Sequence, residues 1–449
     1  MQSESIDEEV LQQLRNAEFE RNDDGILTFS NEATAGQQGI MVCLVTAYPD
    51  SKTAAEKERL LNLAIEGMAR GTMNHPSRDR VTRAYKEKRL NPFSVQTQRT
   101  DNRINFYMTG FFPYGTSAIT SLESGLLLVE EGFQQARIFS DDGVFNEIRR
   151  DAVRNVDDKK QDPVTRVRAL FFNTYFPYAF PLGEEKERAV LEGVTREGVR
   201  TVLDEQFHNA FPVVLYSGSQ NIADIISSSH PFAGRYSGSR DSSILRSPEV
   251  YDIANMGERD HRQEPGKKMQ FLRAYPLQAK PETEAERIAI DILVRIIGGH
   301  GIESLLGREL RLERSLVYGI NAAYNPELNM MLVRTNHDPA KFDDVVEGTG
   351  RLVTSGMQGN FGTFFEQVRT QRMDAMLFQY QNMFSVPHIG EPDLRLTRTR
   401  EQYVTHATRM TLVERYRRLA ELTPEILRGT AAKFFDPAKS QIFTYGGKP

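Results

Sequence analysis

Apolar and polar positions follow the same two periods in each half of the chain. Apolar runs typical of buried strands occur at Ile40–Val45 and Met269–Leu272. Each run leads into a segment whose apolar residues recur in steps of three and four, which is the spacing of one helix face. These helices are predicted at Ala54–Arg70 and Glu284–Ile297. A strand followed by an amphipathic helix therefore opens each half.

Two pairs of sequence matches indicate that the halves arose by duplication. The tripeptide Ala47–Pro49 recurs as Ala274–Pro276, 227 positions later. Near the end of each half, Thr195 and Thr423 open similar helical segments that lie 228 positions apart. Unrelated matches would not keep their offset within one residue over such a distance. The chain is therefore predicted to be a tandem repeat.

The residues that bound these helices also match between the halves. Thr195 and Thr423 are predicted N-caps, because a threonine hydroxyl can accept a hydrogen bond from a free backbone N–H of the first turn. The opening helices are predicted to end at Gly71 and Gly298, because glycine takes the left-handed backbone conformation without a Cβ clash. A closing strand follows the last helix of each half, at Val213–Tyr216 and Gln441–Tyr445.

The middle of each half contains further strands and long helices. Arg103–Gly110 alternates apolar and polar residues and is expected to be a half-buried strand. Such segregated elements predict an α+β fold of two homologous domains in tandem, each an antiparallel sheet covered by helices. The other predicted strands and helices are Leu316–Tyr324 and Met330–Thr335, then Leu122–Phe133, Phe145–Leu170, Phe342–Ser355 and Phe361–Gln381.

Length and composition agree with two ordinary domains. The 449 residues are too many for one hydrophobic core. The predicted boundaries are 1–226 for the first domain, 227–266 for a linker rich in Ser, Gly, Arg and Asp, and 267–449 for the second domain. The net charge of -5 comes from interspersed acidic and basic residues, which argues against a nucleic-acid partner. No apolar run approaches the roughly 18 residues of a membrane-spanning helix.

The first residues and the single cysteine bear on the compartment. Residues 1–10 are acidic and polar, unlike the basic and apolar regions of a signal peptide, so a cytoplasmic protein is expected. A periplasmic protein whose signal peptide was removed is the alternative. Cys43 has no second cysteine to pair with, and its apolar surroundings favour a buried thiol over a nucleophile.

The second half contains a glycine-rich turn, a short helix and a strand in close succession. Gly298–Gly301 form the turn, Ser304–Leu306 and Glu309–Arg311 the helical part, and Ser315–Tyr318 open the strand. This order is similar to the second-half signature of the pitrilysin/insulinase-like metallopeptidases, also called inverzincins. The two tandem halves resemble the same family over most of the chain.

The resemblance implies both a fold and a way of holding peptide. It implies half of a four-domain clamshell, which a second subunit of similar size would complete. Arg311 and Tyr318 have the seven-residue spacing of the family's Arg/Tyr pair, which contacts the substrate backbone near the scissile carbonyl. A cation and a phenol donor are suited to hold a carbonyl. The alternative is a solvated arginine and a core tyrosine. The turn supplies further candidates for peptide binding: Gly298, Gly299, His300 and Gly301.

The metal motif of the family is absent from the first half. Active members carry His-x-x-Glu-His on the helix that corresponds to Ala54–Arg70, where two histidines four apart hold zinc and the glutamate activates water. Aligned on the closing Gly-Thr, the three motif positions are Asn62, Ile65 and Glu66. Because neither this alignment nor one shifted to Leu63, Glu66 and Gly67 contains a histidine, no catalytic residue and no metal ligand is assigned to this chain.

No other pattern in the sequence supplies a zinc site. The third ligand of the family would correspond to Arg154 or Asn155, and Glu147 is the nearest glutamate. No two of the eight histidines lie three to five positions apart, the spacing of a local metal pair. His75 follows the former zinc helix, but a loop histidine beside proline is more often a turn residue than a ligand.

The sequence leaves three hypotheses, which the resemblance orders. The first is a non-catalytic subunit of a heterodimeric zinc metallopeptidase, which binds peptide and contributes Arg311 and Tyr318 to the zinc site of a homologous partner. This chain would then hold no cofactor itself, and a self-dimer is the alternative assembly. The second is a structural or peptide-recognition protein without proteolysis. The third, an independent zinc peptidase with rearranged ligands, has the least support.

Overall fold

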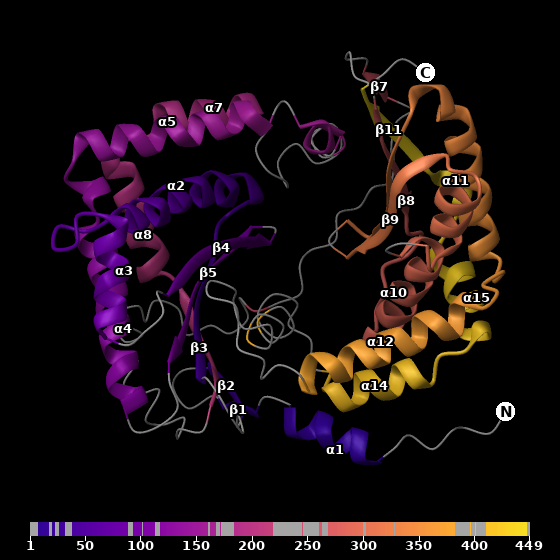
Figure 1. Cartoon of the computed structure of the whole chain (residues 1–449), viewed down its shortest axis with the longest axis horizontal. Helices are drawn as coiled ribbons and strands as arrows, with labels where there is room; N and C mark the ends of the chain where they lie inside the picture. Colours follow the sequence, from indigo (N-terminus) through magenta and orange to yellow (C-terminus); the bar gives the residue numbers. More distant parts are fainter. Residues whose placement is uncertain are drawn as a thin grey trace.

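Two β-sheets, each with helices against one face, make up the computed structural model of the chain (Figure 1). The sheets lie on the inner sides of the two halves, and most helices lie on the outer sides. The structure describes residues 8–17, 20–22, 27–31, 38–88, 93–100, 102–112, 117–159, 162–167, 171, 184–218, 245, 260–262, 268–299, 302–326, 328–381, 396, 400 and 410–446.

The strand order repeats between the sheets, as the duplication predicted. The first sheet has the order β1-β2-β6-β3-β5-β4, and the second has the order β7-β11-β8-β10-β9. The strands of the first sheet are β1 (Glu20–Asn22), β2 (Leu27–Asn31), β3 (Gln38–Ala47), β4 (Ser94–Thr100), β5 (Arg103–Phe112) and β6 (Phe211–Ser217). Those of the second are β7 (Asp260–Arg262), β8 (Met269–Pro276), β9 (Val317–Asn325), β10 (Met330–His337) and β11 (Gln441–Tyr445).

Strand pairing confirms two predominantly antiparallel sheets. In each sheet a single neighbouring pair is parallel among the described strands, β2 with β6 and β7 with β11, and these pairs hold equivalent places. Strand β7 lies inside the predicted linker 227–266. Apart from this strand and residue 245, that range lies outside the described residues.

Helices of the first half pack on one face of the first sheet. The rings of Phe106 on β5, Phe133 on α4 and Phe207 on α8 form a triangle with centroid distances of 4.6–5.5 Å. Thr195 caps α8 as predicted, with its hydroxyl accepting from the Gly198 N–H. The helices are α2 (Ser51–Arg70), α3 (Arg78–Glu87), α4 (Ser117–Gln135), α5 (Asp142–Lys159), α7 (Glu184–Gly193) and α8 (Arg196–His208).

The second half has an equivalent core beneath its own helices. Ile288, Ile292 and Ile296, the predicted apolar face of α10, are all buried. Thr423 caps α15 as predicted. These helices are α10 (Glu284–Gly298), the π-helical turn η4 (Gly307–Glu313), α11 (Phe342–Met357), α12 (Phe364–Gln381), α14 (Leu412–Ala420) and α15 (Pro424–Phe434). Among the described residues, no helix has the length and apolar character needed to cross a membrane.

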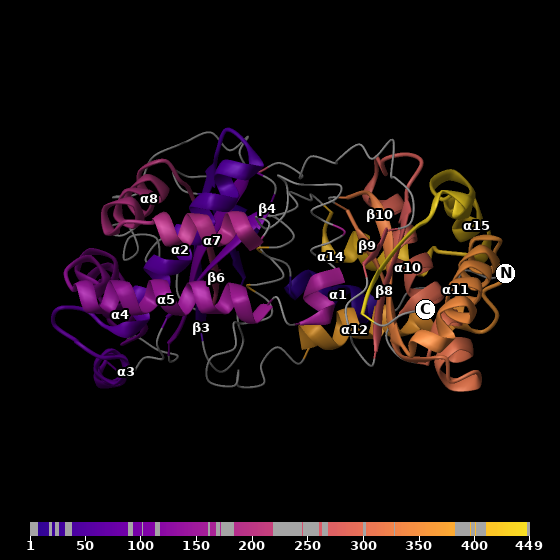
Figure 2. The same ribbon diagram turned by 90° about the horizontal axis from the view of Figure 1, so that it is seen from above.

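Helix α1 (Glu8–Ala17) precedes the first sheet in the chain but packs on the second half. Figures 1 and 2 place it beside α12 and α14. Its Leu11 and Leu14 are buried in the core of the second half. The two halves are therefore joined by more than the chain that connects them.

The second face of each sheet is covered by residues of the other half. Phe171 is buried against β8, β10 and β11, and its ring meets that of Phe443 edge-on at a centroid distance of 5.1 Å. In return, Leu396 is buried against β3 and β6 of the first sheet. Arg400 lies 3.9 Å from the ring centroid of Tyr107 on β5. Because of this reciprocal packing, the second face of each sheet is shielded from solvent by side chains of the other half.

Two sequence predictions differ from the structure: the half-buried character of the strand Arg103–Gly110 and the single helix Phe145–Leu170. Arg103–Gly110 is buried at every position rather than on one face, because helices cover one side of β5 and residues of the second half cover the other. The single helix predicted at Phe145–Leu170 is also wrong. Helix α5 ends at Lys159, and Val167, which belongs to a separate helical stretch at 163–167, is buried against the second sheet.

Candidate functional site

The degenerate metal helix, α2, begins and ends as its sequence predicts. The Asp50 side chain caps it by accepting from the Thr53 N–H at 2.7 Å. Gly71 ends it with φ 128°, a left-handed value that a Cβ would strain. Along one side of α2, polar residues recur every fourth position, and we call this set the polar stripe: Glu58, Asn62, Glu66 and Arg70.

The first two members of the polar stripe contact the edge strand β4. Asn62 Oδ1 accepts a hydrogen bond from Thr97 Oγ1 at 2.9 Å. Glu58 pairs with Arg99 at 3.4 Å, and both side chains are largely buried. The first motif position is therefore engaged in holding α2 to the sheet.

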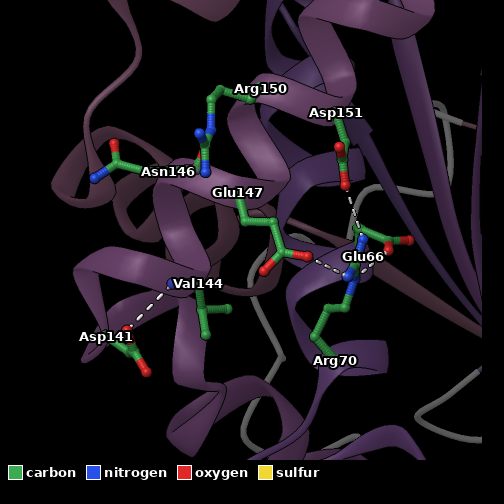
Figure 3. A network of polar contacts seen from close by, with 8 residues as sticks. All are labelled: Glu66, Arg70, Asp141, Val144, Asn146, Glu147, Arg150 and Asp151. Atoms are coloured by element: carbon green, nitrogen blue, oxygen red, sulfur yellow. Dashed lines mark hydrogen bonds and ion pairs between the residues drawn. The ribbon is translucent and has the colours of Figure 1, made fainter.

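The other two members form an ion-pair network with α5 (Figure 3). Arg70 Nε donates to Glu66 Oε1 at 2.9 Å. Its Nη1 donates to Glu147 Oε1 at 2.8 Å, and its Nη2 donates to Asp151 Oδ2 at 3.0 Å. All three guanidinium nitrogens thus bind a different carboxylate. The hydrogen bond that Arg70 donates to Glu66 is the largest cause of the raised pKa of Arg70.

The remaining motif position holds no group that could activate water. Ile65 is partly buried and packs against the core of the first half. Arg154 and Asn155, where the third ligand was expected, are exposed, and α5 instead faces Arg70 through Glu147 and Asp151.

Neither His75 nor Cys43 adds catalytic chemistry. His75 Nε2 lies 3.8 Å from Glu131 Oε2, in the loop that follows Gly71. Cys43 is buried within the first sheet, and burial raises the pKa of its thiol to about 12, which keeps it protonated and inert at neutral pH.

The first half therefore does not fit the zinc chemistry of the motif. In the part of the chain that the structure describes, no three His, Cys, Asp or Glu side chains are placed to hold a metal ion. The carboxylates that α2 and α5 bring together already share a guanidinium. Sequence reasoning missed this role of Arg70, although the four-residue spacings of Glu66–Arg70 and Glu147–Asp151 are a signal for such a network.

In the second half, Gly298 serves close packing rather than a left-handed turn. A Cβ on Gly298 would lie 2.5 Å from the Ala322 Cβ on β9. Helix α10 ends at Gly298 as predicted, but Gly298 does not have the left-handed conformation that was expected, and Gly299 follows with φ -55°. His300 and Gly301 lie outside the described residues.

Arg311 lies on η4 and is exposed to solvent. The neighbouring Leu310 anchors η4, because it is buried and packs so close to Gly348 that a Cβ there would meet it at 2.6 Å. Arg314 is paired with Glu309 and Asp344. Arg311 itself has no hydrogen-bond or ion-pair partner among the residues with described positions.

Tyr318 lies on the edge strand β9 and is 48% exposed, so it is not a core residue. Its hydroxyl donates to Asp338 Oδ1 at 2.6 Å, and Lys268 Nζ lies 4.4 Å from its ring centroid. The hydrogen bond to Asp338 raises the pKa of the Tyr318 phenol. Since a phenol has one proton, the oxygen of Tyr318 can only accept further hydrogen bonds in this arrangement.

The structure brings together the elements of the predicted pair but does not join the two side chains. Strand β9 packs on η4 and on α10, with Ala322 against Gly298. Within the described residues, no hydrogen bond links Arg311 to Tyr318. On packed neighbouring elements, the second half therefore presents a cation, Arg311, without a partner among the described residues, and two hydrogen-bond acceptors, Tyr318 and Asp338.

Comparisons with known proteins identify the fold. No protein-family profile and no curated protein sequence match the chain. A peptidase M16 inactive domain from Pseudomonas fluorescens is 12% identical and aligns over 96% of this chain and 98% of its own, with a TM-score of 0.74. The periplasmic protease PqqL of Escherichia coli, also 12% identical, aligns over 96% of this chain and 46% of its own, with a TM-score of 0.70.

A chain of complex III2 from Candida albicans is 9% identical and aligns over 96% of both chains, with a TM-score of 0.64. These likenesses show that the chain has the fold of M16, or pitrilysin-like, peptidases, which confirms the resemblance seen in the sequence.

Proposed function

We propose that this chain, which has the M16 peptidase fold, binds extended peptide without cleaving it and contributes Arg311 and Tyr318 to a zinc site held by a homologous partner. The observation that carries the proposal is the contrast between the two half-sites. In the first half, the side chains of the polar stripe are already hydrogen-bonded to other residues of this chain. In the second half, Arg311 is exposed and unpaired among the described residues.

The first half-site gives no route to hydrolysis. Metal-assisted hydrolysis requires an open coordination position and a group that activates water. Ile65 stands where that glutamate would be, and it packs into the core. Arg70 neutralises the carboxylates beside it. Bond cleavage is therefore assigned to the partner.

The second half-site suits a peptide backbone. The Arg311 guanidinium can donate to a peptide carbonyl. The Tyr318 oxygen accepts, so we assign it to a peptide N–H rather than to the carbonyl expected from the sequence. Because β9 is the last strand of the second sheet, an extended peptide can add beside it through backbone hydrogen bonds.

The size of the chain supports a paired assembly. The alignment with PqqL includes 96% of this chain but only 46% of the PqqL chain. PqqL is therefore a single protease chain about twice as long. A homologous zinc-bearing subunit, encoded by the same organism, would supply the second half of such an enclosure. A dimer of this chain with itself would contain no zinc motif and would serve binding alone.

Peptide binding by the purified chain tests the proposal. Fluorescence anisotropy with a panel of fluorescein-labelled, unstructured peptides should show saturable binding. Arg311→Ala should weaken it about tenfold, the effect of losing one charge-assisted hydrogen bond. Tyr318→Phe should weaken it about fivefold, because a neutral hydrogen bond contributes about 1 kcal/mol.

Two variants outside the site serve as matched controls. Tyr324→Phe changes a tyrosine on the same strand, and Arg418→Ala removes an exposed arginine on α14. Both should bind like the unmodified chain. Absence of saturable binding, or equal affinities for the site variants and the controls, would remove peptide recognition from this surface.

A second function is favoured by one comparison. The likeness to a chain of complex III2 supports a structural subunit that has the peptidase fold but no peptide to bind. In that case the Arg311 surface would be buried against another subunit. For this second function, the tagged chain should co-purify in a stable complex that Arg311→Ala dissociates. Arg311→Ala should then have no effect on peptide binding, which distinguishes this function from the first.

A further inference from the structure

We propose that Arg400 is the receptor for a carboxylate on the face of the first sheet that it covers together with Leu396. The ligand accepts hydrogen bonds from the Arg400 guanidinium and is either a small free carboxylate or the C-terminal carboxylate of a peptide. The site belongs to the first sheet, whereas Arg311 and Tyr318 belong to the second half. The proposal therefore does not depend on the function assigned to that pair.

Arg400 is buried without an acceptor for its charge. The residue is 3% exposed, and its Nε and Nη1 atoms have no hydrogen-bond partner among the described residues. Each of these nitrogens shares an edge of the guanidinium with Nη2, and a carboxylate binds such an edge through two parallel hydrogen bonds. A cation that is buried without a counter-ion is strongly unfavourable. A bound carboxylate would remove this cost.

The sheet beneath the guanidinium supplies no negative charge. Arg400 lies 3.9 Å from the ring centroid of Tyr107, which is paired with Cys43 across β5 and β3. Burial raises the pKa of the Cys43 thiol, and the positive charge of Arg400 acts in the opposite direction, so the guanidinium lies close to both residues. The strands β3, β4, β5 and β6 contain no Asp or Glu. A counter-ion for Arg400 therefore has to come from outside the sheet.

A second unsatisfied group lies on the same face. Thr109 follows Tyr107 by two positions on β5, so both side chains point to the same side of the sheet. Thr109 is 1% exposed, and its hydroxyl has no hydrogen-bond partner in the described part of the chain. A hydroxyl can donate to a carboxylate. One guanidinium balances one negative charge, so a carboxylate suits this face better than a phosphate group, which carries about 1.5 to 2 charges at neutral pH.

Thermal unfolding in sodium acetate and in sodium chloride at equal ionic strength tests binding of a small carboxylate. Acetate should raise the Tm of the native chain by about 2–4 °C over chloride, and the rise should saturate. Arg400→Met keeps an unbranched stem beside Tyr107 but removes the guanidinium, so this variant should unfold at the same temperature in both salts. Arg400→Lys keeps the charge but not the planar edge, and it should give a smaller rise.

Two fluorescein-labelled peptides that differ only at the C-terminus test the second source of the carboxylate. Both lack Asp and Glu, and one ends in a free carboxylate whereas the other ends in an amide. In fluorescence anisotropy, the free acid should bind the native chain about tenfold more tightly, and Arg400→Met should bind both peptides alike. Arg311→Ala should weaken both peptides equally and leave the acetate response unchanged, which separates this site from the proposed function.

Arg200→Met is the matched control for the loss of an arginine that lies over an aromatic ring. Arg200 lies 4.9 Å from the ring centroid of Phe139, and its guanidinium is already paired with Asp204. This variant should respond to acetate and distinguish the two peptides as the native chain does.

The two measurements identify the ligand or overturn the proposal. An acetate response that Arg400→Met abolishes supports the receptor and, with equal binding of the two peptides, identifies a small carboxylate. A preference for the free acid that Arg400→Met abolishes supports it and identifies a peptide C-terminus. If the native chain distinguished neither acetate from chloride nor the free acid from the amide, Arg400 would be no receptor. An acetate response that Arg400→Met retains in full would also overturn the proposal, because acetate would then act elsewhere.

Discussion

At the scale of single residues, a neighbouring charge decides what each site residue can bind. Tyr318 donates its only proton to Asp338, which reverses the hydrogen-bonding role that its sequence position suggests. Glu66 occupies one of the three motif positions, but Arg70, one turn later on the same helix, neutralises its charge. Arg311 keeps an exposed charge because Glu309, on the same turn, pairs with Arg314 and Arg351 instead.

The link between Tyr318 and Asp338 predicts a pH effect. A hydrogen bond from the phenol to a carboxylate stabilises the protonated phenol, and this raises the pKa of Tyr318. Asp338→Asn should therefore return the pKa toward its ordinary value, so that Tyr318 ionises at a lower pH. NMR titration of ¹³C-labelled tyrosines, with Tyr318→Phe to assign the signal, measures this directly.

Asp343→Asn provides the matched control for this titration. Asp343 is an exposed carboxylate on the first turn of α11, and Asp338 precedes the same helix. This variant should leave the pKa of Tyr318 raised. A pKa that does not change in Asp338→Asn would show that the hydrogen bond has no part in setting it.

The close packing around Gly298 predicts that a larger residue at this position destabilises the fold. A Cβ at this position would lie 2.5 Å from the Ala322 Cβ and 3.0 Å from Leu306 Cδ1. Gly298→Ala should therefore lower the free energy of unfolding by about 1–3 kcal/mol. Gly429→Ala, inside α15 with open space around it, should raise it by about 0.5–1 kcal/mol. Urea denaturation should give these opposite signs, and equal effects would contradict the packing role.

At the scale of elements, local signals predicted most helices and strands correctly. Threonine caps and apolar periodicity located α8, α10 and α15, because these signals act within one or two turns. The second cover on β5 was missed, because Leu396 and Arg400 come from almost 300 positions further along the chain. Alternation of apolar and polar residues cannot report a face that a distant, partly polar segment covers.

The candidate site shows the same limit. The family signature pointed to Asn62, Glu66, Arg311 and Tyr318, and it could do so because spacing survives in sequence. The partners that set their chemistry, such as Thr97, lie on other elements. Pairing of this kind depends on tertiary packing, so the sequence could name candidate residues but not the partners that they have in the structure.

The reciprocal cover of the sheets predicts large effects from two buried side chains. Phe171→Ala should lower the free energy of unfolding by about 3–5 kcal/mol and Leu396→Ala by about 2–5 kcal/mol, because both side chains are fully buried against the opposite half. Val164→Ala, an exposed side chain in the helical stretch before Phe171, should change it by less than about 0.5 kcal/mol. Chemical denaturation measures all three. If both core variants lowered the free energy of unfolding only slightly, the two halves would be stable without their contacts to each other.

At the scale of the whole molecule, duplication and divergence have produced two unequal halves. The strand order is the same in both halves, and side chains from each half pack on the sheet of the other half. Their sites differ: the first is closed by Arg70, and the second leaves Arg311 exposed. We propose that a chain with this division holds a peptide and leaves cleavage to another subunit.

Zinc content and peptide cleavage, measured on the same purified preparation, test this division most directly. The chain alone, incubated with zinc and then desalted, should retain no stoichiometric zinc and should cleave no peptide in a quenched-fluorescence library. Adding the zinc-bearing homologue encoded by the same organism should produce cleavage that decreases with Arg311→Ala in this chain. One zinc ion per lone chain, together with cleavage that a chelator abolishes, would contradict the account.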